Sequence, residues 1–502
     1  MLDARRGTRK TFDKPGTESA DLVVDGGRAA AAVGAGALSV GVPGDKSVSH
    51  RALLAALLPG APEVLTVRNA NVGGAVRALL PAMRALGVEV VAGADGATLT
   101  VRRGAAPVPQ RVREHPDVAR WPEGVPYVET GGSSAAARLL IGVLAGSGTP
   151  AVVDGDDVLR HRPMDWLVDP LAELGADITY LGDDGCLPVW VKGPVCRPGR
   201  TVELRVGSAQ ARSGVLLALA AAGLPGTVRH PVRSRDHTER MLASFGGELD
   251  EGDSELVWAG RAFQVPGGID VPADPSLAAY PVAAHLLWGD GGTLRVPGVC
   301  LNPTRTGFFE VLRRGGADIS YAYEHGRGDA PECGDGSGTG STEGGRPRAG
   351  EPVGTVVVRG GLDAVESVRV DEPWLLHALI DEVPLLALVA ARLPGTSWIG
   401  CAQELRFKET DRLTTTARMA EAFGARIEVA ADGLTVHGGA PLRAGVVPGF
   451  EDHRIAMAAA TLAGCLPGRT TVRGGACHRT SFPDFADVQR AVGARIAKDP
   501  EA

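Results

Sequence analysis

Two patterns of apolar and polar positions recur along the chain. In the first, an amphipathic helical stretch ends in a glycine and a short β-branched or alternating run follows it. A glycine at that place suits a helix C-cap, where the backbone turns left-handed. Most copies are about 70 to 90 residues apart, and the glycines are Gly87, Gly175, Gly246, Gly316, Gly424 and Gly493.

The second pattern interleaves with the first and joins an Ala/Leu-rich helix, a Gly/Pro turn and a short strand. Its six copies are LLPGAPEVLTV, LAGSGTPAVV, AGLPGTVRH, WGDGGTLRV, RLPGTSWIG and CLPGRTTVR. Glycine is common in connections between helices and strands everywhere, so the spacing alone gives moderate support for true repeats. Together the two patterns predict six helix-strand-helix-strand units.

Two stretches lack any apolar period. Residues 1–35 and 324–353 are rich in Gly, Ser, Pro and charge. We expect a disordered N-terminal extension over 1–35 and a flexible Gly-rich insertion over 324–353. The insertion lies between two predicted strands of one repeat and lengthens the interval between Gly316 and Gly424.

Composition narrows the class of protein. A chain of 502 residues is long enough for two or three domains, and with 44% apolar but only 4% aromatic residues its core must be Ala, Leu and Val. A net charge of −7 argues against a nucleic-acid-binding surface. No apolar run approaches the roughly 18 to 20 residues of a membrane span, and seven irregularly spaced cysteines fit reduced thiols, so we predict a cytoplasmic protein.

The segment GVPGDKSVSHRALL concentrates groups that suit an anion. Lys46, Ser47, Ser49 and Arg51 stand at the mouth of an Ala/Leu-rich helix, where the first turn offers unpaired N–H groups. A simple helix cap with solvated basic residues is the alternative for this segment alone.

Charged clusters also adjoin other apolar helical runs. Taken singly, each is better explained as a surface ion pair beside a helix cap. Several clusters of the same design favour convergence on one site for a charged small molecule; their residues are Arg162, Asp381, Glu382, Arg406, Lys408, Glu409, Asp411, Arg412, Asp452 and Arg454.

From about Ala37 to Gly493 the chain resembles the 5-enolpyruvylshikimate-3-phosphate synthase family of enolpyruvyl transferases. The blocks that carry the resemblance, in order, are GDKSVSHRALL, DGDDVLRHRPMDWLVDPLAELGADI, SAQARSGVLLAL, SRDHTERML, LNPTRTG, IDEVPLLALVAA, ELRFKETDRL, EDHRIAMAAA and TSFPDF. So many blocks in one order are far more specific than a single glycine motif.

The resemblance implies an α/β (α+β) fold of two domains, each with three βαβαββ units about a pseudo-threefold axis and with the active site in the interdomain cleft. It places the first domain at residues 45–271 and the second at 36–44 plus 272–495. The chain is expected to cross between domains near Gly44 and near Pro272–Asp274.

The implied reaction transfers the enolpyruvyl group of phosphoenolpyruvate to the 5-hydroxyl of shikimate-3-phosphate and releases phosphate, a step of aromatic amino acid biosynthesis. Arginine suits the oxyanions because its planar fork binds them in pairs of hydrogen bonds, and carboxylates set against lysine suit proton transfer. The chemistry implies no cofactor and no metal. We expect two small-molecule substrates, no nucleic acid, no membrane and a monomer.

The resemblance also assigns site residues. The catalytic set is Lys46, Asp381 and Glu409, of which Asp381 takes the hydroxyl proton and Glu409 with Lys46 serves the methylene carbon. The phosphoenolpyruvate-binding set is Lys46, Arg162, Gln210, Arg412 and Arg454. The acceptor-binding set is Ser47, Arg51, Ser208, Gln210, Ser234, Asp381 and Lys408. Without the resemblance, Ser208 reads as a helix N-cap and Gln210 as a surface amide.

Two segments depart from the family pattern. Where the family has a Gly-Asn-Ser-Gly-Thr loop before Arg138, this chain has Gly131, Gly132, Ser133, Ser134 and Ala135. The segment NANVGG at residues 69–74 also lacks an acidic pair that is common in the family.

These departures leave two further functions open. One is a pathway-specific paralogue that transfers enolpyruvyl to another phosphorylated alcohol, such as a nucleotide. The other is an inactive homologue that acts as a binding module, against which the intact Lys46, Asp381, Glu409, Arg412 and Arg454 argue.

Overall fold

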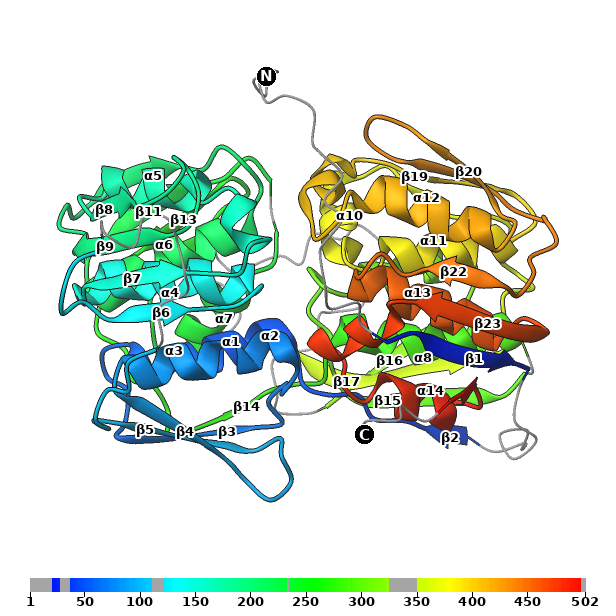
Figure 1. Cartoon of the computed structure of the whole chain (residues 1–502), viewed down its shortest axis with the longest axis horizontal. Helices are drawn as coiled ribbons and strands as arrows, with labels where there is room; N and C mark the ends of the chain where they lie inside the picture. The colour runs from blue at the N-terminus through cyan, green and yellow to red at the C-terminus, as the bar shows by residue number, and fades with distance from the viewer. Residues whose placement is uncertain are drawn as a thin grey trace.

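The computed structural model describes residues 20–27, 37–110, 121–232, 234–289, 291–324 and 350–497. The chain forms two halves, seen side by side in Figure 1. Each half has its own large apolar core: one runs from Val48 to Val271, and the other joins Leu22–Val42 to Ala273–Ile496. The sequence is therefore divided close to residues 45 and 272, where the chain passes from one half to the other.

Three four-stranded sheets make up the first half. In spatial order their strands are β14 (Gly268–Asp270), β3 (Val64–Arg68), β5 (Leu99–Arg103) and β4 (Val88–Ala92); β6 (Tyr127–Glu129), β7 (Ala151–Asp154), β9 (Val189–Gly193) and β8 (Asp177–Tyr180); and β10 (Arg200–Glu203), β11 (Gly226–Arg229), β13 (Glu255–Trp258) and β12 (Leu249–Glu251).

The second half repeats this arrangement. Its sheets are β2 (Ala37–Ser39), β15 (Thr293–Cys300), β17 (Val353–Arg359) and β16 (Asp318–Tyr323); β18 (Arg369–Val370), β19 (Thr396–Ile399), β21 (Leu434–His437) and β20 (Arg426–Val429); and β22 (Val446–Pro448), β23 (Gly468–Arg473), β1 (Leu22–Gly26) and β24 (Arg495–Ile496).

All six sheets share one topology. Each begins with a parallel pair of strands, and the third and fourth strands add antiparallel. A parallel pair needs a crossover, and helices supply it, as in a βαβ unit. The six units predicted from the sequence are thus present, and the mixed α/β class in two domains is confirmed.

Helices fill the interior of each half. Those of the first half are α1 (Lys46–Leu54), α2 (Gly74–Arg77), α3 (Leu79–Ala85), α4 (Ser134–Ser147), α5 (Asp165–Glu173), α6 (Ala209–Ala222) and α7 (His237–Ser244). Those of the second are α8 (Pro275–Trp288), α9 (Gly307–Arg314), α10 (Pro373–Leu379), α11 (Val383–Arg392), α12 (Arg412–Ala422), α13 (His453–Gly464) and α14 (Phe485–Ala491).

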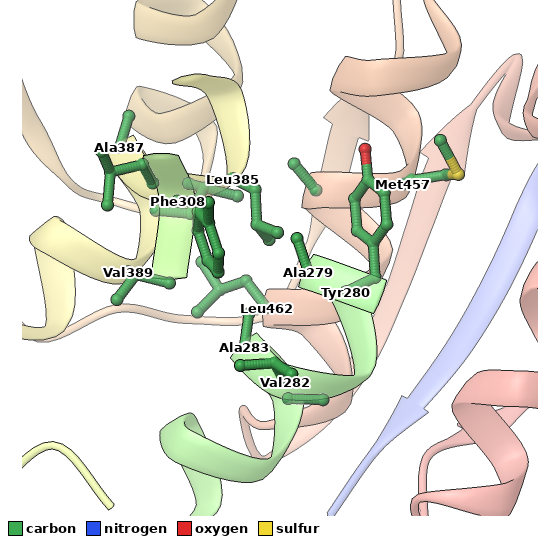
Figure 2. Packing of buried hydrophobic residues seen from close by; sticks show 14 of the residues in the cluster. Ala279, Tyr280, Val282, Ala283, Phe308, Leu385, Ala387, Val389, Met457 and Leu462 are labelled. Carbon is green, nitrogen blue, oxygen red and sulfur yellow. The ribbon is translucent and has the colours of Figure 1, made fainter. Parts of the chain in front are cut away.

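The central helices carry small residues because they pack closely on all sides. In the second half, Figure 2 shows Ala279 and Ala283 of α8 facing Leu385 of α11 and Leu462 of α13. In the first half, a Cβ on Gly142 of α4 would lie only 2.2 Å from a backbone oxygen of α6, so the two backbones touch. This close approach fixes α4 and α6 relative to each other.

The six repeat glycines end helices as the sequence predicted. All have left-handed backbones, with φ between 77° and 110°, and a strand follows each; they are Gly87, Gly175, Gly246, Gly316, Gly424 and Gly493. The local pattern identified these helix ends because only glycine adopts such angles without strain.

The prediction of disorder over 1–35 is wrong for residues 22–26. They form β1, an inner strand between β23 and β24, and Leu22 and Val24 are buried in the core. The partners of β1 lie more than 440 residues away along the chain, so the surrounding composition gave no sign of the pairing. Residues 1–19 and 28–36 lie outside the described residues.

The predicted insertion does lie between neighbouring strands, because β16 and β17 pair antiparallel on either side of it. Its boundary at 353 is wrong, since residues 350–353 are part of the folded half and Glu351 Oε1 lies 2.7 Å from Nδ1 of the buried His237. Residues 325–349 are outside the described part of the chain.

Within the described ranges, no single helix has the length and apolar character to cross a membrane; α10 and α11, bent by 99° at the break between them, meet those criteria only as a pair.

Candidate active site

Arg412, the first residue of α12, is the centre of a cluster of charges in the second half. Its guanidinium binds Asp452 through two bonds, Nε–Oδ2 at 2.8 Å and Nη2–Oδ1 at 3.1 Å. It also reaches Glu409 Oε2 at 2.6 Å and Asp381 Oδ1 at 3.3 Å. Three carboxylates therefore converge on one buried cation, and the two predicted for proton transfer share it.

Asp381 immediately precedes Glu382, the N-cap residue of α11. Besides Arg412, its carboxylate contacts Arg235 Nη2 at 2.8 Å and Arg454 Nη2 at 3.8 Å. Burial acts to raise the pKa of Asp381, but Arg235, Arg454 and Arg412 outweigh it and hold that pKa well below its usual value. The group is therefore a carboxylate at neutral pH.

Arg454, near the start of α13, has unused hydrogen-bonding capacity. Its side chain is 2% exposed, and its Nε and Nη1 atoms are buried without a hydrogen-bond partner among the described residues. Leaving buried charged donors unsatisfied costs more than the one long contact to Asp381 returns. The geometry therefore suits an anionic ligand that accepts these hydrogen bonds.

Lys46 enters the cluster from the first half as the first residue of α1. The preceding Asp45 caps the helix, its Oδ1 accepting from the Val48 amide at 2.8 Å. Burial and the nearby charge of Arg454 lower the pKa of Lys46, although Asp381 and Glu409 pull it the other way. A lysine with a lowered pKa gives up its proton more readily, which suits a general acid.

Glu409 is contacted from both halves. Arg162 of the first half approaches its Oε1 at 3.4 Å, and Arg412 holds its Oε2. Burial works to raise the pKa of Glu409, but the two guanidinium groups prevail and keep it well below the ordinary value. Lys46, Arg162, Asp381, Glu409, Arg412 and Arg454 are thus brought together as the sequence grouped them.

The predicted acceptor residues Ser47 and Arg51 lie on α1 beside Lys46. Arg51 is buried and donates to Thr238 Oγ1 at 2.7 Å, to Ser213 Oγ at 2.8 Å and to the Ser47 carbonyl at 2.9 Å. Because all three partners are neutral, the positive charge of Arg51 is not cancelled by a bonded carboxylate. It remains able to attract the phosphate of an acceptor.

Ser208 and Gln210 stand at the start of α6. Ser208 is the N-cap, its Oγ accepting from the Ala211 amide at 3.3 Å, as read from the residues alone. The Gln210 side chain is not a free surface amide, because Arg138 of α4 donates to its Oε1 at 2.6 Å. This bond orients the amide, with its NH₂ group facing away from Arg138.

Ser234 is buried in a loop that Arg212 supports by donating to the carbonyls of Ser234 and Arg235 at 3.1 and 3.0 Å. Lys408 pairs with Glu404 on its own half, so its ammonium group is already engaged. The predicted acceptor set is therefore distributed over several loops and helix starts.

Sequence reasoning missed two residues of the cluster. Arg235, in the quoted block SRDHTERML, crosses to Asp381, and His453, in EDHRIAMAAA, has a buried Nε2 without a partner among the described residues. Burial and the charge of Lys46 lower the pKa of His453 to about 3, so its ring is neutral. Both residues adjoin residues already selected, and that adjacency was the only available signal.

The departing loop at Gly131 forms the start of α4. Gly131 has φ +55°, Ser133 is the N-cap, and Ser134 is the first helical residue. A Cβ on Gly132 would lie 2.9 Å from Asp156 Oδ2, so a larger residue here requires the end of the Asp156 side chain to shift.

Within the described part of the chain, no group of three or more His, Cys, Asp or Glu side chains is arranged to hold a metal ion. The site is instead a set of arginines and a lysine set against carboxylates, contributed by both halves of a two-domain α/β fold. Such a site defines an enzyme that binds small anionic substrates between two domains.

Comparisons with known proteins agree on a family. The family model of EPSP synthase (3-phosphoshikimate 1-carboxyvinyltransferase) matches residues 35–488. The 3-phosphoshikimate 1-carboxyvinyltransferase of Desulforamulus reducens is 34% identical over 90% of this chain and 96% of its own length, and that of Roseiflexus sp. is 36% identical over 91% and 96%. This chain belongs to the EPSP synthase family of enolpyruvyl transferases.

Solved structures give the same result for the fold. The EPSP synthase of Acinetobacter baumannii superposes with a TM-score of 0.75 at 28% identity, covering 95% of this chain and all of that one. The enolpyruvyl transferase NikO of Streptomyces tendae, at 20% identity and a TM-score of 0.67 over 96% of this chain and 99% of its own, shares the fold alone.

Proposed function

We propose that this chain transfers the enolpyruvyl group of phosphoenolpyruvate to the 5-hydroxyl of shikimate-3-phosphate and releases phosphate. In balance, the acceptor hydroxyl loses a proton, its oxygen becomes bonded to the central carbon of the enolpyruvyl group, and the bond from that carbon to the phosphate oxygen breaks. Family membership supports the reaction class.

The single observation that carries the proposal is the unsatisfied guanidinium of Arg454. Its Nε and Nη1 atoms are buried without a hydrogen-bond partner among the described residues, and its Nη2 makes only the 3.8 Å contact with Asp381. An incoming phosphate or carboxylate satisfies those donors without displacing a protein partner. Arg454 therefore binds phosphoenolpyruvate in this scheme, with Arg162, Gln210 and Lys46 near it.

The pKa directions support one division of the proton transfers. Asp381 and Glu409 have lowered pKa values and are ionised, so they accept protons, whereas the lowered pKa of Lys46 makes it the better donor. In our scheme Asp381 takes the hydroxyl proton, Lys46 protonates the methylene carbon, and Glu409 later receives the proton that the methyl group returns.

The acceptor side binds through Ser47, Arg51, Ser208, Gln210, Ser234 and Lys408. To use Lys408, the acceptor must compete with Glu404, and to use Asp381 it must displace Arg235. A dianionic phosphate is strong enough to draw both cations toward itself.

A second acceptor class is favoured by one observation, the loop at Gly131, where Gly132 accommodates Asp156 and the family's asparagine amide is absent. Under this reading the enzyme moves enolpyruvyl to a different phosphorylated alcohol, such as a nucleotide.

The test is a steady-state assay of phosphate release from phosphoenolpyruvate with no added metal. Shikimate-3-phosphate, shikimate and a UDP-sugar are compared as acceptors. Release with shikimate-3-phosphate alone supports the proposal; release with the UDP-sugar alone supports the second class. No release with any acceptor, from protein whose unfolding is cooperative, contradicts both.

We further propose that the enzyme is a cytoplasmic monomer. Light scattering of the purified chain tests the oligomeric state, and fractionation of the source cells tests the compartment.

A further inference from the structure

The two passages of the chain between halves lie against each other. One runs from β2 into α1, the other from β14 into α8, and they touch through a bridge between Gly44 and Ala273. A Cβ on Gly44 would lie 1.7 Å from the carbonyl oxygen of Asn69, so only glycine fits there. Each passage ends in an aspartate that caps the next helix, Asp45 for α1 and Asp274 for α8.

Arg305 joins these two caps. Its Nη1 donates to Asp45 Oδ2 at 2.6 Å and its Nη2 to Asp274 Oδ1 at 3.0 Å, with a further bond to Ser276 Oγ at 3.1 Å. The side chains of all three ion-pair partners are at most 3% exposed. One planar fork thus holds the start of a helix in each half.

The contact continues into the first half through α7. Arg305 Nη1 lies 3.0 Å from His237 Nε2, and His237 Nδ1 lies 2.7 Å from Glu351 Oε1. Because a guanidinium only donates, Nε2 accepts from Arg305, and the protonated Nδ1 donates a hydrogen bond to Glu351 Oε1. His237 therefore ties α7 to both Arg305 and Glu351 of the second half.

The same carboxylates hold the first turn of α1. Asp274 Oδ2 accepts from the Lys46 amide at 3.2 Å, and Asp45 Oδ1 accepts from the Val48 amide. Each aspartate thus uses one oxygen for Arg305 and the other for the backbone around Lys46. A displacement of the Arg305 fork moves both carboxylates and with them the Lys46 backbone.

We propose that Arg305 is a positioning residue: by clamping Asp45 and Asp274 it sets the place of Lys46 against Asp381 and Glu409 across the two halves. This inference rests on the function proposed above. Arg305 touches no candidate substrate residue directly and acts through the two caps. Arginine is required because lysine is a point charge and cannot bind two carboxylates in one plane.

Stability alone does not account for such a cluster. Buried ion pairs contribute little net stability, because desolvation offsets their attraction, and well-packed apolar replacements are often neutral or better. Their geometry is nevertheless well defined. Here the ion-paired aspartates also bind the backbone at Lys46, the residue that donates a proton in the proposed reaction. A misplacement of about 1 Å costs roughly 100-fold in rate.

Two variants test the proposal. Arg305→Lys keeps the charge but loses the fork. The triple variant Asp45→Asn, Asp274→Asn, Arg305→Met removes all three charges together, and asparagine still caps helices. We therefore expect this variant to fold, so that a loss of activity is not explained by unfolding. The matched control is Arg313→Lys, on the exposed face of α9, where Arg313 pairs with Glu310.

We expect kcat of both test variants to fall by about 10- to 100-fold, with KM for phosphoenolpyruvate changed less than about threefold. The control retains wild-type kcat. Hydrogen exchange at the Lys46 and Val48 amides is expected to quicken in Arg305→Lys while that of α11 and α13 stays unchanged.

The proposal is overturned if the triple variant keeps wild-type kcat, or if kcat falls only in proportion to the folded fraction. A wild-type protein without turnover on any acceptor removes the proposed function but not the clamp, because hydrogen exchange still reports on it. Unchanged protection of the Lys46 and Val48 amides in Arg305→Lys then rejects the clamp itself.

Discussion

Asp381 and Glu409 share the guanidinium of Arg412, so their charges are not independent. Each also receives a second arginine from the other half of the molecule, Arg235 for Asp381 and Arg162 for Glu409. Withdrawing Arg235 from Asp381 removes a charge that depresses its pKa. An acceptor that draws Arg235 away therefore strengthens Asp381 as a base at the moment a hydroxyl arrives.

Neutralising the three candidate catalytic residues is expected to lower turnover strongly. Lys46→Ala, Asp381→Asn and Glu409→Gln should each reduce kcat by about 100- to 10,000-fold, because each removes an oriented acid or base. Steady-state phosphate release measures the loss. Asp371→Asn, at an exposed aspartate paired with Arg369, is the control and should change little.

If all three variants keep kcat within a few-fold of the wild type while unfolding normally, the assignment of proton transfer to this cluster is wrong.

Two buried histidines are expected to make stability depend on pH. Burial lowers the pKa of His50 to about 4, and burial with the charge of Lys46 lowers that of His453 to about 3, from an unfolded value of 6.5. Below pH 6.5 the unfolded chain therefore binds protons that the folded chain refuses. The free energy of unfolding should fall by up to about 1.4 kcal/mol per pH unit for each histidine, down to about pH 4.

Urea denaturation at a series of pH values measures this slope. His50→Gln should flatten it, because it removes one of the two histidines whose pKa burial lowers. A wild-type stability that stays constant from pH 6.5 to pH 4.5 would contradict the prediction.

At the residue scale, the sequence located the arginines, lysine and carboxylates of the site because each lies in a block with recognisable chemistry. It could not reveal Arg235 and His453 as members, since their roles depend on distances between loops that meet only in the folded chain. It likewise placed Gln210 near the site without its partner Arg138, because that bond depends on the backbone contact of α4 with α6.

At the scale of elements, the short strand β1 shows that a few alternating apolar residues are enough to form an inner strand of a sheet. Its residues alternate between core and surface, with Leu22 and Val24 buried and Val23 half-buried. It lies between β23 and β24 in its sheet, and each of these two strands pairs with β1 rather than with the other. The segment 22–26 therefore contributes a strand and two core residues, although the composition of residues 1–35 predicts disorder.

A pair of adjacent substitutions tests how much β1 contributes to the stability of the core. Val24→Ala should reduce the free energy of unfolding by about 2 kcal/mol, because it removes fully buried methyl groups and leaves a cavity. Val23→Ala, on the opposite face, should cost much less. Denaturant unfolding compares the two.

Equal, small effects of Val24→Ala and Val23→Ala would show that β1 does not contribute to the core in solution.

Most elements were predictable because their signals are local. A glycine with a left-handed backbone ends each repeat helix, and a Gly/Pro turn precedes the next strand, wherever the chain carries these residues. Strand pairing between the two ends of the chain has no local signal. For that reason the six units were found while the first strand of the last sheet was missed.

At the scale of the whole molecule, charges of opposite sign face each other from the two halves. The pairs of Arg162 with Glu409 and of Arg235 with Asp381 both cross between them. In the proposed scheme, arginines of both halves bind the anionic groups of the substrates at once. We expect both substrates together to shift the population toward a more compact form.

Small-angle scattering should show a smaller radius of gyration with both substrates than without them. Arg454→Gln should reduce the decrease in radius, because it removes the guanidinium whose buried nitrogens lack a hydrogen-bond partner among the described residues. An unchanged radius at saturating substrates would mean that the halves do not move.

The far-apart partners of β1 also set an order for synthesis on the ribosome. Asp25 of β1 pairs with Arg469, 444 residues later, whereas all strands of the first half are present once residue 270 is made. At roughly 5 to 20 residues per second, β1 emerges and then waits about 20 to 90 seconds for its neighbours. The first half can complete its sheets during that interval, and the nascent second half keeps an apolar strand uncovered until β23 has been made.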